Sequence, residues 1–107
     1  MTTTYIDNVQ EPLPSGGANM YTAGTISYSK IDYATVYNDS ASNVTLDVEV
    51  TKSGSSAAQY IKTIVPANSQ VILYELINRT LKSGDIVKLT PSVADVLNAS
   101  LGIREVV

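Results

Sequence analysis

The sequence contains no cysteine and no histidine. The first absence excludes disulfides and thiol chemistry, and the second removes the commonest general base and the commonest transition-metal ligand. Zinc sites built on these two residue types are excluded as well. The serines occur in turns and on polar strand faces, without the sequence context of a nucleophile elbow. We therefore predict a protein that is not an enzyme and that holds no cofactor or metal.

Carboxylates offer the remaining routes to catalysis or metal binding. Asp47 and Glu49 lie two residues apart on one face of a predicted strand. A paired-carboxylate site is conceivable there, but alternation by itself demands polar residues at these positions. Oxygen ligands for calcium would come from Asp32, Asn38, Asp39, Asn43 and Asp47. Their spacing matches no calcium loop, and turns select Asn and Asp for backbone reasons, so both sets are interpreted as ordinary surface and turn residues.

The chain is also poor in charge and in long apolar runs. Charged residues make up 16% of the sequence, the net charge is −3, and the seven Lys and Arg are scattered with no two adjacent. Because nucleic acids and anionic membranes bind clustered Lys and Arg, we expect neither as a partner. No apolar run approaches the length of a membrane span, and residues 1–5 lack the pattern of a signal peptide. The protein is therefore expected to be made in the cytoplasm.

Phenylalanine and tryptophan are missing too, so all seven aromatic residues are tyrosines. A tyrosine combines a large apolar ring with a polar tip that can face water or a partner. Tyr33 and Tyr37 fall on one side of a predicted strand together with Ile31 and Thr35. Such a row either fills the core of a chain that lacks other aromatics or forms an exposed surface for a protein or a sugar. Both interpretations stay open, and Tyr33 and Tyr37 are candidate partner-binding residues.

What the sequence does contain is alternation with a period of two. Val or Leu alternates with Thr, Asp and Glu over residues 44–51, which predicts a strand with one buried face in an antiparallel sheet. Further strands are predicted at residues 31–37, 59–65, 70–74, 86–90 and 101–107, and residues 19–28 are predicted as two short strands or one bulged strand. A short helix is predicted at residues 75–81, and residues 93–98 are predicted as a short helix or a loop. About seven short strands predict an all-β fold, either an antiparallel β-sandwich or a Greek-key barrel.

The first 18 residues differ from the rest and are predicted to be an extended N-terminal arm, followed by a β-sandwich domain at residues 19–107. Two prolines and a Gly-Gly pair near the end of this segment oppose strand pairing. Yet the segment carries four apolar side chains, Tyr5, Ile6, Val9 and Leu13, from which a solvated tail gains nothing. We therefore expect these four residues to dock on a neighbouring subunit, with the arm mobile in the free protein and ordered in an assembled particle.

One long stretch of the chain resembles a known class of proteins. It runs through VPANS at residues 65–69, LYELI at 73–77, LKSGDI at 81–86 and LGIREV at 101–106. In its turn chemistry and apolar strands, the segment from residue 20 to residue 107 resembles the small β-rich virion structural proteins of tailed bacteriophages. The resemblance implies a structural part of a particle and supplies no catalytic residues.

Within such a virion, the expected function is that of a capsid-decorating or cement protein that binds the major capsid protein as a symmetric homo-oligomer. Two alternatives remain: a head–tail connector or tail component, and a carbohydrate-binding β-sandwich module that uses the tyrosine row. The expected location is the virion, and the expected partners are other virion proteins.

Overall fold

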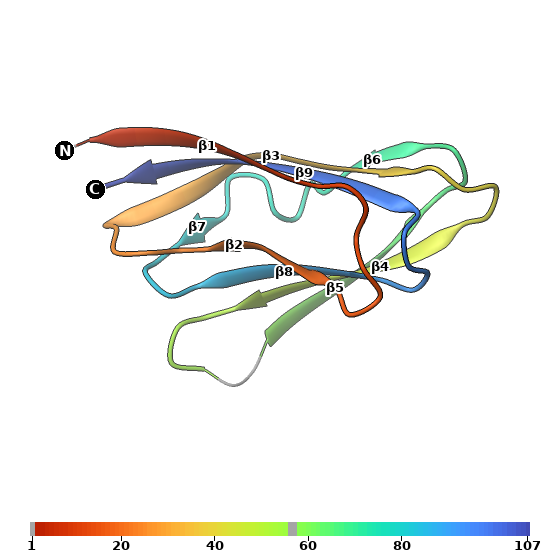
Figure 1. Ribbon diagram of the computed structural model, residues 1–107. Coiled ribbons are helices and arrows are strands. Elements are labelled where there is room, and N and C mark those ends of the chain that lie inside the picture. The colour runs from red at the N-terminus through yellow and green to blue at the C-terminus, as the bar shows by residue number, and fades with distance from the viewer. Residues whose placement is uncertain (1, 56–57) are drawn as a thin grey trace.

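The computed structural model describes residues 2–55 and 58–107, with only the backbone of Ala58 described (Figure 1). These residues form nine strands: β1 (Thr3–Gln10), β2 (Ala18–Thr22), β3 (Tyr28–Asn38), β4 (Val44–Thr51), β5 (Ala58–Val65), β6 (Gln70–Ile72), β7 (Thr80–Leu81), β8 (Ile86–Pro91) and β9 (Leu97–Val106). The described part of the chain holds no helix that is long and apolar enough to cross a membrane.

The strands form two antiparallel sheets that face each other. One sheet has the order β1-β9-β3-β6, with β7 also paired to β3, and the other has the order β2-β8-β4-β5. Figure 1 shows the first sheet above the second. Early and late strands interleave in both sheets, which is the strand order of a jelly roll. The prediction of an all-β antiparallel sandwich is confirmed.

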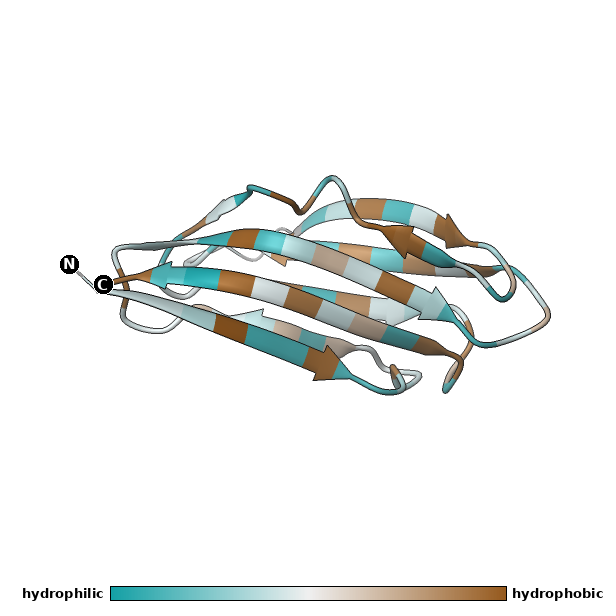
Figure 2. Ribbon diagram, turned by 90° about the horizontal axis from the view of Figure 1, so that it is seen from above, coloured by the Kyte–Doolittle hydropathy of each residue, from teal (hydrophilic) through white to brown (hydrophobic). Residues whose placement is uncertain are grey.

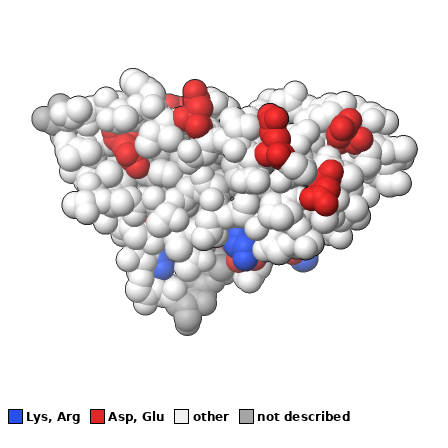
Figure 3. Space-filling model, viewed as in Figure 1, with Lys and Arg blue, Asp and Glu red and all other residues white. Residues whose placement is uncertain are grey.

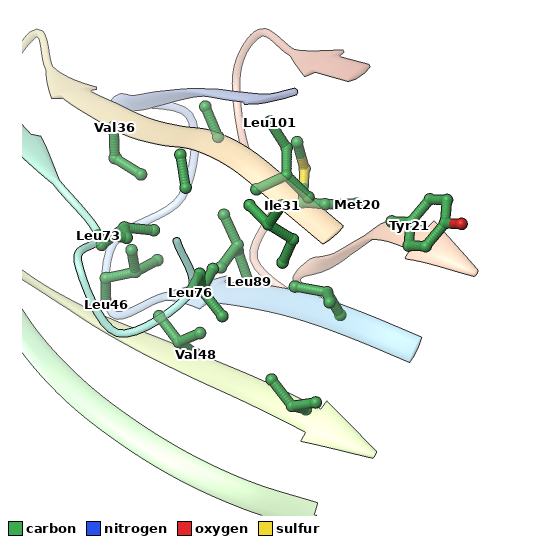
Figure 4. Packing of buried hydrophobic residues seen from close by; sticks show 14 of the residues in the cluster. Met20, Tyr21, Ile31, Val36, Leu46, Val48, Leu73, Leu76, Leu89 and Leu101 are labelled. Atoms are coloured by element: carbon green, nitrogen blue, oxygen red, sulfur yellow. The ribbon is translucent and has the colours of Figure 1, made fainter. Parts of the chain in front are cut away.

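The core lies between the sheets and consists of aliphatic side chains from alternate strand positions. Along β4, buried and half-buried residues alternate without a break, as the sequence predicts. Leu46 and Val48 of β4 point toward Ile31, Val36 and Leu101 of the opposite sheet (Figure 4). The alternation is also visible as bands of opposite hydropathy along the strands in Figure 2.

The prediction that Ile31, Tyr33, Thr35 and Tyr37 share one face of a strand is wrong at its first position. The register between β3 and β9 shifts between Ile31 and Tyr33, so Asp32 is an extra residue on β3. Such a bulge reverses the side of every residue that follows it. Ile31 is therefore 1% exposed inside the core, whereas Tyr33 and Tyr37 are each 39% exposed on the outer side of the sheet.

The predicted helix at residues 75–81 is also wrong, because the described chain contains no helix. Residues 74–78 form successive turns, held by bonds such as that from the Leu76 amide to the Leu73 carbonyl (3.0 Å). Asn78 then adopts a left-handed backbone conformation with a φ of 64°, which a helix cannot continue through. Leu73 and Leu76 are both buried, so these turns cover part of the core.

The first 18 residues do not form an arm separate from the sandwich. Residues 3–10 are β1, which pairs with β9 along its whole length from Thr3↔Val106 to Gln10↔Ala99. Leu13 is fully buried in the core and Ile6 packs against that core. These two side chains therefore pack within their own chain and not on a neighbouring subunit. Deleting the segment would remove a strand and expose the core to water. Met1 lies outside the described residues.

A buried carboxylate, Asp85, fixes one end of the sandwich. It is 2% exposed and accepts hydrogen bonds from the Ser53 amide (2.8 Å), the Lys82 amide (2.9 Å) and the Lys52 ammonium (3.1 Å). Burial by itself raises the pKa of Asp85, but these three donors outweigh it and hold the pKa below its ordinary value. The contacts join the turn before β8 to the segment that follows β4.

We predict that Asp85 makes stability depend on acid pH. Because its pKa is lower in the folded chain than in the unfolded chain, its stabilisation is complete above the unfolded value of about 3.9 and is lost as the pH falls through the folded value. Asp85→Ala leaves buried donors unpaired and should cost roughly 1–3 kcal/mol at pH 7. Urea unfolding at several pH values checks this. A difference between wild type and variant that stays constant down to pH 2 would contradict it.

Candidate functional site

The outer side of the β1–β9–β3–β6 sheet carries a row of exposed apolar side chains. Five of them define what we call the tyrosine face: Tyr5 (74% exposed), Val9 (55%), Tyr33 (39%), Tyr37 (39%) and Ile72 (45%). The strand register places all five on one side. Val9, for example, pairs with Ser100, which pairs with Thr35, which in turn pairs with Ile72. Clustered exposed apolar groups of this kind mark interaction surfaces.

The outer side of the other sheet carries two exposed apolar side chains, Tyr60 (64%) and Ile64 (60%), together with charged residues of both signs. Asp47 forms an ion pair with Lys62 (2.9 Å), and Glu49 lies opposite Lys88 and Tyr60 on the two neighbouring strands. This face therefore neutralises its own charge. Seen from the side, the molecule shows separate acidic residues in its upper part and a few basic ones lower down (Figure 3).

Two of the four carboxylates considered as catalytic or calcium-binding candidates form ion pairs within the chain. Asp47 is bound to Lys62, and Asp32 is bound to Arg104 (3.2 Å). The Asn38 amide is buried, where it donates to the Val65 carbonyl (2.9 Å) and accepts from the Ser40 amide (2.9 Å). Over residues 2–55 and 58–107, no three His, Cys, Asp or Glu side chains gather as metal ligands.

In the described part of the chain the two sheets have four edges, and the one formed by strand β1 is open. Thr2 and Val107 exchange both main-chain hydrogen bonds, at 3.2 and 2.9 Å. In an antiparallel pair such bonded pairs alternate, so Thr4, Ile6 and Asn8 bond to β9. The main-chain groups of Tyr5, Asp7 and Val9 therefore point away from the sheet.

The other three edges carry features that discourage pairing with another chain. Strand β2 has five residues and a register shift, and the edge beside β3 consists of β6 and β7, with three and two residues. Strand β5 has a regular register but places the exposed Lys62 at its centre. By contrast, β1 has eight residues in unbroken register without lysine, proline or bulge.

A contact across three strands holds β1 in place. The ring of Tyr33 lies over Gly102 so closely that a Cβ atom on Gly102 would come within 2.1 Å of it. The Tyr33 hydroxyl reaches β1 and donates to Asp7 Oδ1 (2.7 Å). This bond to a carboxylate favours the protonated hydroxyl and raises the pKa of Tyr33. Glycine at position 102 thus lets an aromatic ring of β3 tie the edge strand to the sheet.

The structure brings four of the six predicted partner-binding residues together on the tyrosine face: Tyr5, Val9, Tyr33 and Tyr37. It turns the other two, Ile6 and Leu13, toward the core. Ile72 could not be predicted from the sequence, because its place on this face depends on the pairing of β6 with β3. Only a known register would have found it.

A shallow hollow opens at one end of the same face. Its volume is about 310 Å³, and its lining residues are Thr3, Tyr5, Tyr28, Lys30, Asn78, Arg104 and Val106. No pattern in the sequence indicates this hollow. Lys30 and Arg104 are far apart in the chain and meet only because β3 pairs with β9.

Comparisons with known proteins reveal similarity of fold alone. No family model matches the chain, and a search of curated proteins finds no significant match. A solved protein of the Bacillus endospore appendages, a family of disulfide-linked pili, has a TM-score of 0.56 and 14% identity, over 99% of this chain and 88% of that one. The Eiger TNF of S. frugiperda has a TM-score of 0.45 and 12% identity, over 98% of this chain and 85% of that one.

We predict that Tyr33→Phe loosens β1 without unfolding the sandwich, since it removes one side-chain hydrogen bond worth about 1 kcal/mol. Hydrogen exchange at the Thr4, Ile6 and Asn8 amides should become faster, while exchange in β4 stays unchanged. Tyr37→Phe is the matched control, because Tyr37 has the same exposure and its hydroxyl bonds to none of the described residues. Equal exchange in both variants would show that the bond to Asp7 does not hold the edge.

Proposed function

We propose that this chain is a non-enzymatic structural protein that works as a subunit of a larger protein assembly. In its most specific form, the proposal is a capsid-decorating protein of a tailed-bacteriophage virion, which binds the major capsid protein and forms a homo-oligomer. A head–tail connector or tail component would use the same contacts in a ring of different symmetry.

The open edge of β1 carries the proposal. Its outward main-chain groups, at Tyr5, Asp7 and Val9, offer a ready template for a strand from another chain. An edge that is long, regular and free of lysine and proline is a liability in a solitary protein. In a subunit that assembles, the same edge is the binding site.

The tyrosine face and the fold add support. Tyr5 and Val9 project from β1 beside the open edge, so a strand added there would extend the sheet and its exposed apolar face. Jelly rolls are common among viral capsid domains, although the fold alone does not determine function. The likeness to the Bacillus pili is one of fold, and the present chain has no cysteine with which to form disulfide links.

The experiment is to replace Val9 by proline. Proline removes the outward N–H of Val9 and blocks strand addition, while the bonds that Asn8 and Gln10 make with β9 stay in place. In co-sedimentation with capsids that lack this protein, we expect Val9→Pro to bind at least about tenfold more weakly than wild type.

Val9→Thr is the matched control, because it keeps the N–H and a β-branched side chain, and it should bind like wild type. Equal binding by Val9→Pro and wild type would contradict a role for the β1 edge. A third outcome is that the wild-type protein does not bind capsids but forms oligomers, and that Val9→Pro abolishes these oligomers. That result would contradict the capsid as the partner and support assembly through the β1 edge.

A further inference from the structure

The hollow on the tyrosine face brings two cations together on neighbouring strands. Arg104 of β9 lies directly opposite Lys30 of β3 and directly opposite Tyr5 of β1, so the three residues form one row across the sheet. Side chains at directly opposed positions have Cβ atoms about 5 Å apart, and like charges there destabilise a sheet. The row therefore carries an electrostatic repulsion between Lys30 and Arg104, although the net charge of the whole chain is −3.

The surrounding residues only partly compensate these charges. Arg104 has an ion pair with Asp32 (3.2 Å), but Lys30 donates to a neutral group, the Thr80 hydroxyl (2.9 Å). A third cation, Lys82, lies 5.9 Å from the centre of the Tyr28 ring. Among the described residues that line the hollow, none is acidic. The positive charge of Lys30 is therefore not neutralised within the hollow, and an anionic group of a ligand could pair with it.

The other lining groups point to the rest of the ligand. The Tyr5 ring is 74% exposed, and such a ring can pack against the apolar face of a sugar. Asn78 and Thr3 bring an amide and a hydroxyl, which can pair with sugar hydroxyls, and Val106 is an apolar lining residue. At about 310 Å³ the hollow is at the small end of ligand sites, which suits a single ring.

We propose that this hollow binds a carboxylate-bearing sugar unit, such as a uronic acid within a glycan. Lys30 and Arg104 hold the carboxylate, with the guanidinium supplying paired N–H donors, and the Tyr5 ring packs against the sugar. A bare anion would leave the Tyr5 ring and the neutral polar groups unused, which is why a sugar acid fits better than an inorganic ion. The hollow shares Thr3 and Tyr5 with β1, but its proposed contacts are made by side chains and not by the outward main-chain groups of that edge.

The test is a calorimetric titration of the full chain with an oligogalacturonate, compared with a neutral galacto-oligosaccharide of the same length. Inorganic phosphate and a glutamate-rich peptide serve as probes for anion binding without sugar recognition. We expect saturable binding of the oligogalacturonate alone, weakened about tenfold by Lys30→Met and weakened again by added salt.

Lys88→Met on the opposite sheet is the matched control, because it removes the same charge outside the hollow, and it should leave the affinity unchanged. Tyr5→Ala should weaken binding while melting like wild type. The proposal would be overturned by absent binding, by equal binding of the neutral oligosaccharide, or by full affinity in Lys30→Met. Equally tight binding of phosphate or of the peptide would overturn the sugar assignment.

Discussion

The structure depends on one constraint: the aliphatic side chains of two antiparallel sheets must face each other and exclude water. Leu46, Val48 and Leu89 from one sheet meet Ile31 and Leu101 from the other, and all five are at most 1% exposed. Because strand residues alternate between faces, burial of the inner set determines which residues face outward. The core thereby sets the composition of the tyrosine face and the position of the hollow. Strand β9 has a central place, since it pairs with β1 on one side and with β3 on the other.

The strands with a local alternating pattern could be predicted from the sequence. The predictions were wrong where one extra residue or the pairing with a distant strand determines which way the side chains face. The alternation over residues 44–51 identified β4 with its two faces. One extra residue, Asp32, reversed the faces of the predicted strand at residues 31–37, and nothing in its own chemistry signals a bulge. Prolines and glycines after β1 suggested an arm, although the apolar side chains of Ile6 and Leu13 belong to the core. Tyr33 and Tyr37 were candidates because they form a tyrosine row, and Tyr5 and Val9 because they are apolar residues of the expected arm. The pairing of Lys30 with Arg104 requires the register.

The two outer faces and the β1 edge differ in the chemical groups that they expose. The face of the β2–β8–β4–β5 sheet neutralises its charges internally, as in the ion pair between Asp47 and Lys62. The tyrosine face exposes apolar rings, with Lys30 and Arg104 in the hollow at its end, and Tyr33 stabilises the edge strand by its bond to Asp7. A regular and firmly held β1 suits strand addition, because the free chain already holds the conformation that binding requires.

The central claim is that the free edge of β1 receives a strand when the protein assembles. The most direct measurement is a cryo-electron microscopy structure of the assembly. We expect a strand from a neighbouring chain about 4.8 Å from β1, bonded to the main-chain groups of Tyr5, Asp7 and Val9. An assembly in which the β1 edge faces solvent, with the subunits joined by side-chain contacts elsewhere, would contradict it.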